Sequence, residues 1–364
     1  MNSKKIGIMD ESITSLNGGP KVFMMRLKEA IIKKDMYSEN EFDKWINLSF
    51  KEVPKFVENR LKKVELIVRF DGIWNTTFIP GWLFSPKVVK SVNTAIFKRV
   101  NKIILMNYKL ANKVIYQSEF SKFQTEKLLF ERFKLATPLK ESIIIYNGVD
   151  LKSFKPMKEY RNTENFPNIL ISHRLTPIKR AHQVYLIIER LVEKYPNLKV
   201  HVVGGGIINP FRFGRDSRKE IIKDIKKRGL SKHFVFYGYV EPIELAKVYN
   251  KCDFMLNLSF ADPCPNVVIE AMACGLPVVA PNHGGIPELI GDDRLLVDET
   301  IDVKDFQSKY IYRDIPLIDP SEYEKKIVLL LKDLGHYSSQ MRFRAEQYFD
   351  ISKVADQYID FICK

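Results

Sequence analysis

Residues 259–288 read Ser-Phe-Ala-Asp-Pro-Cys-Pro-Asn-Val-Val-Ile-Glu-Ala-Met-Ala-Cys-Gly-Leu-Pro-Val-Val-Ala-Pro-Asn-His-Gly-Gly-Ile-Pro-Glu, and this stretch decides the fold class of the chain. The apolar run 254–258 before it predicts a buried strand, and a proline-stiffened loop then carries Asp262. Asn266 is typical of a helix cap, and the helix that it opens carries Glu270 one turn later. Two carboxylates therefore flank a helix start, whose free amides can bind a diphosphate.

Two α/β domains are expected from the spacing of apolar runs. The 364 residues are 45% hydrophobic, which is enough to fill two ordinary cores. Short apolar strands alternate with helical stretches, and this alternation predicts two Rossmann-like doubly wound parallel sheets. The strands are expected at about 4–9, 65–70, 113–117 and 142–146, and then at about 168–173, 199–203, 234–237, 254–258, 277–280 and 294–297.

A polar segment bounded by prolines separates these two sets of strands. It covers residues 151–167 and is expected to link a first domain at residues 1–150 to a second domain at residues 168–337. Residues 338–364 predict two helices. Ligands of such sheets bind beyond the carboxyl ends of the strands, so the loop that carries Asp262 is expected to line the site.

The acids Asp262 and Glu270, eight residues apart, resemble the acidic pair of retaining glycosyltransferases with the GT-B fold, in the large family often called GT4, or glycosyl transferases group 1. That family usually has Glu at the first position, so Asp262 keeps the charge but loses one methylene of reach. The resemblance implies two domains that face a central cleft, with the C-terminal helices crossing back to the first domain. It also implies transfer of a sugar from a nucleoside diphosphate sugar, UDP- or GDP-linked, to a glycan or lipid-linked acceptor hydroxyl, with retention and without a metal or other cofactor.

Two cations follow the first strand of the second domain and resemble the family's ligands for the donor diphosphate. Arg174 offers a guanidinium fork and Lys179 a compact ammonium, a combination that suits two phosphates. Their charge would stabilise the leaving group as the glycosidic bond breaks. This is the charge that a metal-dependent transferase draws from a divalent ion.

Glycine loops at the same edge can bring the backbone close to a nucleotide. Gly204 to Gly206 lack the G-x-G-x-x-G spacing and the following acid of a dinucleotide fold, so an NAD oxidoreductase is disfavoured. The turn at Asn147 and Gly148 resembles the one that closes the family's first domain. The resemblance implies the following donor-binding residues: Gly18, Gly19, Gly204, Tyr239, Val240, Pro265, Asn266, Val267 and Glu270.

The residue that deprotonates the acceptor is less plain from the sequence. Several members of the family place a histidine in the first domain, but all six histidines of this chain lie beyond residue 170. Asp71, which ends a strand near Arg69 and Trp74, is the candidate for acceptor orientation or proton capture, and an ordinary capping acid is the alternative. Glu288 is expected either to bind a donor hydroxyl or to offset a helix dipole.

The charge of the chain is unevenly distributed. The formal net charge is +14, and residues 1–150 hold 26 Lys and Arg against 16 Asp and Glu. The stretch 96–110 predicts a basic amphipathic helix, which either lies on an anionic bilayer or packs on the sheet with its lysines in water. Nucleic acid is ranked lower as a partner, because no zinc-finger, RNA-binding or basic-zipper pattern is present.

Missing sequence patterns indicate where the protein is located and the state of its cysteines. The first residues run directly into an apolar strand without a signal-peptide pattern, and no apolar run approaches a membrane span, so a cytoplasmic location is expected. The four cysteines have no paired metal spacing and are interpreted as reduced thiols, of which Cys264 in the acidic loop is the one open to modification.

Two other classes of protein compete with a transferase. A sugar-nucleotide epimerase of similar fold would need no acceptor, and product analysis without an acceptor would separate the two. A non-catalytic protein that binds a sugar nucleotide or a glycan would show donor affinity but no turnover. The Asp at position 262 and the missing first-domain histidine keep this second alternative open.

Overall fold

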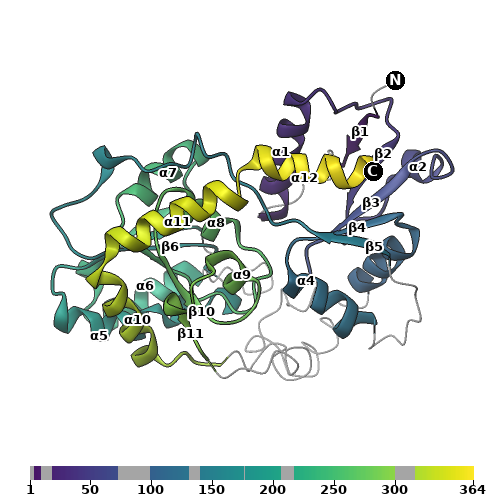
Figure 1. The fold of residues 1–364 in the computed structure, drawn as a ribbon. Helices are drawn as coiled ribbons and strands as arrows, with labels where there is room; N and C mark the ends of the chain where they lie inside the picture. Colours follow the sequence, from purple (N-terminus) through teal and green to yellow (C-terminus); the bar gives the residue numbers. More distant parts are fainter. Residues whose placement is uncertain are drawn as a thin grey trace, which may run out of the picture.

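The computed structural model describes residues 4–9, 19–72, 99–130, 140–175, 177–205, 217–299 and 316–364. Two lobes are visible in Figure 1, each built around one parallel sheet. The first sheet has the strand order β1-β2-β3-β4-β5, and the second has the order β11-β10-β9-β6-β7-β8. The predicted α/β class with two parallel-sheet domains is therefore confirmed, and the strand order reverses within the second sheet.

The first sheet contains one strand that the sequence did not reveal. Lys44 and Asn47 interrupt the apolar pattern of that strand, yet both side chains are buried, and Lys44 forms an ion pair with Glu65 on the neighbouring strand. The polar residues are thus tolerated because the fold supplies their partners. The strands are β1 (Ile6–Ile8), β2 (Lys44–Leu48), β3 (Glu65–Phe70), β4 (Lys113–Tyr116) and β5 (Glu141–Ile144), and the helices include α1 (Gly19–Lys33), α2 (Lys55–Glu58) and α4 (Glu119–Phe123).

The second sheet is buried along nearly all of its length, as parallel sheets covered on both faces are. Its strands are β6 (Asn168–Ser172), β7 (Lys199–Val203), β8 (Phe234–Gly238), β9 (Phe254–Leu256), β10 (Val278–Pro281) and β11 (Leu296–Val297). Helices α5 (Val184–Lys194), α6 (Ser217–Lys227), α7 (Pro242–Asn250), α8 (Asn266–Ala273), α9 (Ile286–Ile290) and α10 (Pro320–Lys332) connect and cover them.

The strand order of the second sheet reverses between β6 and β9. From β6 the chain continues to β7 and β8 on one side, whereas β9, β10 and β11 lie on the other side. The loops that leave the carboxyl ends of β6 and β9 therefore diverge from neighbouring positions at one edge. In open α/β sheets this reversal point is where ligands bind.

The last two helices tie the two domains together. Helix α11 (Leu334–Tyr348) buries Met341 and Ala345 in the second core, and α12 (Ile351–Cys363) buries Val354 and Tyr358 in the first core. Figure 1 shows them in yellow, running from one lobe to the other. The crossing is fixed by backbone hydrogen bonds from Val149 N to Phe349 O (2.8 Å) and from Ile351 N to Val149 O (3.0 Å).

The basic stretch of the first domain is helical over residues 99–110 and packs on its own sheet. Ile104 and Tyr108 belong to the first core, while Lys102 and Lys109 are exposed. This packing fits the predicted surface helix with its lysines in water. The basic face of the helix is exposed. No helix in the described part of the chain is both long enough and apolar enough to cross a membrane.

Candidate functional site

The two loops at the reversal point carry opposite charges that meet. The turn η4 (Pro177–Lys179) follows β6, and Asp262 lies in the loop after β9. The Lys179 ammonium forms an ion pair with the Asp262 carboxylate, and both side chains are partly exposed. A backbone hydrogen bond of 2.8 Å from Phe260 N to Ile178 O joins the same two loops. The fold thus brings together one predicted phosphate ligand and the first predicted acid.

Helix α8 begins one residue earlier than expected and is capped differently. The N-cap is Pro265, without a side-chain hydrogen bond, so the prediction that Asn266 caps the helix is wrong. The Asn266 amide instead donates to Gly19 O of the first domain at 2.9 Å and accepts from Asn147 Nδ2 at 2.7 Å. Its side chain bridges the domains, because carbonyl and amide partners from the first domain face it there.

The second acid, Glu270, is buried and bound by a cation of the first domain. Arg26 on α1 donates to Glu270 Oε1 at 2.6 Å, and Tyr249 OH donates to the other oxygen at 3.3 Å. The side chains of Arg26 and Glu270 are only 15% and 6% exposed, so this ion pair between domains is largely removed from water. Arg26 could not be predicted from the sequence, because no local pattern distinguishes it from the other cations of α1, such as Lys21.

A buried polar cluster continues this contact into the first domain. Arg69 at the end of β3 is fully buried and donates from Nη2 to Gln117 Oε1 at 3.0 Å and to Asn147 Oδ1 at 2.6 Å. The Asn147 amide in turn donates to Cys264 O at 3.0 Å, in the loop that carries Asp262. The predicted closing turn of the first domain therefore touches the acidic loop of the second.

Asp71 lies beside this cluster with unused hydrogen-bonding capacity. Its carboxylate is 2.7 Å from Arg69 Nη2, and burial raises its pKa while the charge of Arg69 lowers it in part. Within the described residues, Asp71 Oδ2, Arg69 Nε and Nη1, and the Tyr358 hydroxyl have no hydrogen-bond partner, and Asp71 Oδ1 has only its ion pair with Arg69. Buried polar atoms without partners are costly, so such a cluster favours a polar ligand or water.

The other predicted site residues are placed as follows. Gly204 has a φ of 122°, and a Cβ there would lie 2.1 Å from His173 O, so this position requires glycine. Arg174 and Tyr239 are exposed, Val240 and Val267 are half-buried, and Pro265 is buried. Gly18 and Trp74 lie outside the described residues, whereas Gly19 contacts Asn266 through its carbonyl.

Glu288 contacts a helix of the other domain. Its carboxylate accepts hydrogen bonds from the backbone amides of Glu119 and Phe120 at 2.8 and 2.9 Å, at the start of α4. Tyr146 OH adds a third hydrogen bond at 3.3 Å, and burial raises the pKa of Glu288. Of the two predicted roles, offsetting a helix dipole fits this geometry, although the helix belongs to the first domain.

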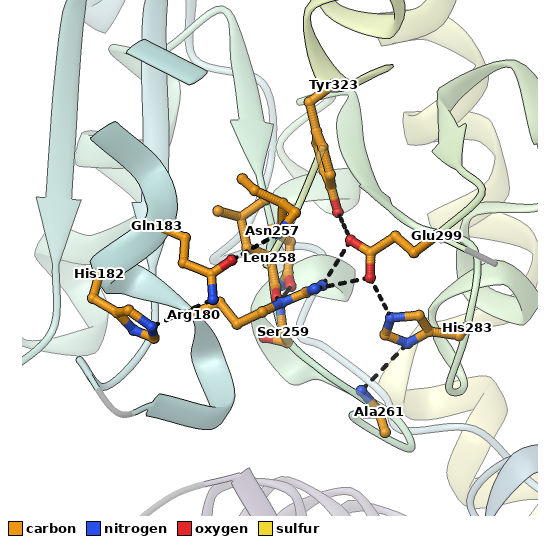
Figure 2. Close-up of polar contacts among 11 residues, drawn as sticks. Arg180, His182, Gln183, Asn257, Leu258, Ser259, Ala261, His283, Glu299 and Tyr323 are labelled. Atoms are coloured by element: carbon orange, nitrogen blue, oxygen red, sulfur yellow. Dashed lines mark hydrogen bonds and ion pairs between the residues drawn. The ribbon is translucent and has the colours of Figure 1, made fainter. Parts of the chain in front are cut away.

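Another buried carboxylate, Glu299, lies among side chains from several loops of the second domain (Figure 2). Arg180, which follows Lys179, binds both Glu299 oxygens at 2.8 and 2.9 Å, and His283 and Tyr323 bind the same carboxylate at 2.9 and 2.5 Å. Burial raises the pKa of Glu299, but the hydrogen bond from His283 and the charge of Arg180 lower it to about 2. The sequence offered no signal for this group, because its members are widely separated along the chain.

The buried thiols and His173 are uncharged at neutral pH. Burial raises the pKa of Cys264 to about 12, which argues against its predicted modification. Burial and the charge of Lys179 lower the pKa of His173 to about 4, so its ring is neutral beside the cations. In the described parts of the chain, no group of three or more His, Cys, Asp or Glu side chains is arranged to hold a metal ion.

Comparison with known proteins finds a family match that lies mainly in the second domain. Residues 154–312 match the family model described as glycosyl transferases group 1. Spore coat protein SA of Bacillus subtilis is 25% identical over 236 residues, which cover 59% of this chain and 56% of that protein. D-inositol 3-phosphate glycosyltransferase 2 of Catenulispora acidiphila is 32% identical over 162 residues, which cover 40% of this chain and 36% of that protein.

The whole fold is similar to that of HepE from Anabaena, solved in complex with UDP. The TM-score is 0.67 at 18% identity, and 99% of each chain is covered. This likeness confirms the predicted GT-B fold. The alignments to the curated relatives above span less than two thirds of those proteins.

The ion pair between Arg26 and Glu270 generates a prediction about stability. The variant Arg26→Met keeps most of the side-chain length but leaves the nearly buried Glu270 without its cation. We expect it to lower the free energy of unfolding by about 3 kcal/mol, and to increase the radius of gyration as the domains separate and Glu270 gains water. Urea unfolding and small-angle X-ray scattering measure the two effects.

Lys34→Met is the matched control, because Lys34 lies on the first-domain surface near α1 and pairs with the exposed Asp356. It should cost less than about 1 kcal/mol and leave the scattering unchanged. Equal small losses from both variants would contradict a structural role for the Arg26 ion pair.

Glu299 predicts a pH dependence of stability. Because its pKa is lowered on folding to about 2, its ionised form stabilises the protein fully above about pH 4.5, and this contribution disappears as the pH falls toward 2. The difference in unfolding free energy between the wild type and Glu299→Gln should shrink by about 2 kcal/mol between about pH 6 and about pH 3. Urea unfolding at a series of pH values measures it. Glu346→Gln, at a half-exposed position, should show no such trend.

Proposed function

We propose that this chain, whose second domain matches the group 1 glycosyltransferases, transfers a sugar from a nucleoside diphosphate sugar to an acceptor hydroxyl. The observation that carries the proposal is the ion pair of Lys179 with Asp262 at the reversal point of the second sheet, in the loop that leads into α8 and its buried Glu270. We assign it to the retaining hexosyltransferases of the GT4 family, on the eight-residue spacing of the two acids.

Donor recognition in this proposal divides between charge and hydroxyl contacts. Lys179 and the exposed Arg174 bind the diphosphate, and the carboxylates of Asp262 and Glu270 accept hydrogen bonds from hydroxyls of the sugar and the ribose. In the structure Lys179 binds Asp262 and Arg26 binds Glu270. Donor binding therefore replaces these ion pairs with contacts to the donor. UDP is the first base to test, because HepE was solved with UDP and with UDP-glucose.

The reaction that we propose needs no metal ion. Arg174, Lys179 and the amides at the start of α8 supply positive charge where the leaving diphosphate forms. The acceptor hydroxyl attacks from the face that the diphosphate leaves, and the leaving phosphate takes its proton, which retains the anomeric configuration. The bond from the sugar to the diphosphate breaks as the bond from the sugar to the acceptor oxygen forms.

In this proposal the acceptor binds at the first-domain cluster around Asp71. Its carboxylate and the Arg69 guanidinium have hydrogen-bonding atoms without partners in the described residues, which is what a site for a hydroxyl requires. Because the leaving phosphate takes the proton, we give Asp71 the first of its two predicted roles: its carboxylate orients the acceptor hydroxyl by accepting a hydrogen bond from it. A glycan or a lipid-linked glycan supplies such hydroxyls.

A lipid-linked acceptor would bring the protein to a membrane surface. The exposed Arg99, Lys102 and Lys109 lie on the helix at residues 99–110 together with Met106, which is 52% exposed. A basic helix with an apolar side chain of this kind can contact anionic lipid. Flotation with anionic and with neutral liposomes tests it, and equal recovery in the soluble fraction would exclude the contact.

The donor site predicts a binding pattern that calorimetry can measure. UDP-, GDP- and ADP-sugars are titrated into the wild type and into Glu270→Ala. We expect one donor to bind with micromolar affinity and the variant to lose at least about tenfold, because the ribose loses a charged hydrogen-bond acceptor. Glu346→Ala serves as a control for loss of a carboxylate away from the site. Absence of binding for every donor would contradict the proposed function.

Asp71 predicts a separation of binding from turnover. In Asp71→Asn the donor affinity should stay within about twofold of the wild type, while transfer to an acceptor falls by at least about a hundredfold. Product analysis with a panel of glycan and lipid-linked acceptors measures the transfer. Unchanged turnover would remove Asp71 from the mechanism, and donor affinity without turnover in the wild type would favour a non-catalytic binding protein.

A further inference from the structure

The buried group around Glu299 has a complete set of hydrogen bonds. We call Arg180, His283, Glu299 and Tyr323 the Glu299 network (Figure 2). Each Glu299 oxygen accepts two hydrogen bonds: Oε1 from Arg180 and Tyr323, and Oε2 from Arg180 and His283. A carboxylate has about four acceptor positions, so every one of them is used. A charge buried in this way holds its donors in a fixed geometry.

One side of the Glu299 network ends beside Lys179. Arg180 is the next residue, its side chain is fully buried, and its Nε donates to Leu258 O at 2.6 Å in the loop after β9. Its backbone has a φ of 51°, a left-handed conformation that is unfavourable for residues other than glycine. The hydrogen bonds of the side chain therefore hold the turn in a conformation that its residue type disfavours.

The other side of the Glu299 network ends beside Asp262. His283 Nδ1 accepts from Ala261 N at 3.4 Å, while Nε2 of the same ring faces Glu299. The tautomer with its proton on Nε2 satisfies both contacts. Ala261 also has a left-handed φ of 51°, so the network supports an unfavourable backbone conformation on this side too. Two loops that bear the opposite charges of the site are thus fixed from one carboxylate.

We propose that Arg180 and Glu299 are positioning residues, which set the separation of Lys179 and Asp262 at which a nucleoside diphosphate is recognised. Their side chains are buried, so they affect a ligand only by holding the loops that carry Lys179 and Asp262. The inference rests on the proposed donor site and adds the groups that hold its geometry. Displacement of a charged ligand by about 1 Å is enough to change recognition strongly, which is why such support determines function.

Three variants separate positioning from general stability. Glu299→Gln keeps the shape but places amide hydrogens against the Arg180 guanidinium. Arg180→Gly removes the side chain, and glycine adopts the left-handed backbone conformation without strain, so the variant tests the side chain alone. Glu324→Gln is the matched control, because Glu324 follows Tyr323 on α10 but binds Arg190 and Lys194, which are about half exposed.

The first readout is affinity for the diphosphate part of the ligand. UDP, GDP and ADP are titrated alone, and the nucleoside of the one that binds the wild type is then measured by ligand-observed NMR. We expect Glu299→Gln and Arg180→Gly to weaken the nucleoside diphosphate by about tenfold or more and the nucleoside by less than about twofold. Arg180→Lys, which restores one charge, should recover part of the loss.

The second readout needs no ligand. Amide hydrogen exchange of Phe260 and Ala261 reports the two loop contacts, and it should accelerate in Glu299→Gln and in Arg180→Gly but not in Glu324→Gln. Unchanged exchange, unchanged diphosphate affinity, or equal losses for nucleoside and diphosphate would each overturn the positioning role. A wild type that binds no nucleotide would overturn the proposed function as well, so the two failures are distinguishable.

Discussion

The reversal of strand order between β6 and β9 is the constraint on which the site depends. Neighbouring parallel strands end at the same edge, and here their loops leave in opposite directions, so the chain itself leaves a place that no crossover helix fills. The turn with Lys179 and the loop with Asp262 flank that place, and α8 starts beside it. Local sequence supplies the charges, while sheet topology puts them within contact.

Two ion pairs balance the charges of the candidate site. Lys179 binds Asp262 within the second domain, and Arg26 binds Glu270 across the domains. A nearly buried carboxylate without a partner would be costly, so the first domain completes the second before any donor arrives. Under the proposed function, donor hydroxyls and Arg26 compete for Glu270, which couples donor binding to the contact between the domains.

Contacts at the domain interface and contacts within the second domain hold the loops of the candidate site. At the interface, Asn147 and Asn266 join the closing turn of the first domain to the start of α8, and Glu288 caps α4. Within the second domain, Glu299 accepts hydrogen bonds from Arg180 and His283, which support the left-handed backbone of Arg180 and Ala261. The crossing from α11 to α12 adds a covalent link, because one continuous segment belongs to both cores.

The sequence by itself determined the class of the fold, most of its strands and two charged residues of the candidate site, Lys179 and Asp262. Apolar runs and the loop between β9 and α8 are local patterns, and local patterns are legible in one chain. Only the tertiary structure decided that β2 is a strand, that Asn266 bridges domains instead of capping α8, and that Arg26 binds Glu270. Arg26 and Glu270 are 244 positions apart, and Arg180 and Glu299 are 119 apart, so no local pattern records either contact. Packing of distant elements creates these partners, and burial then makes their charges matter.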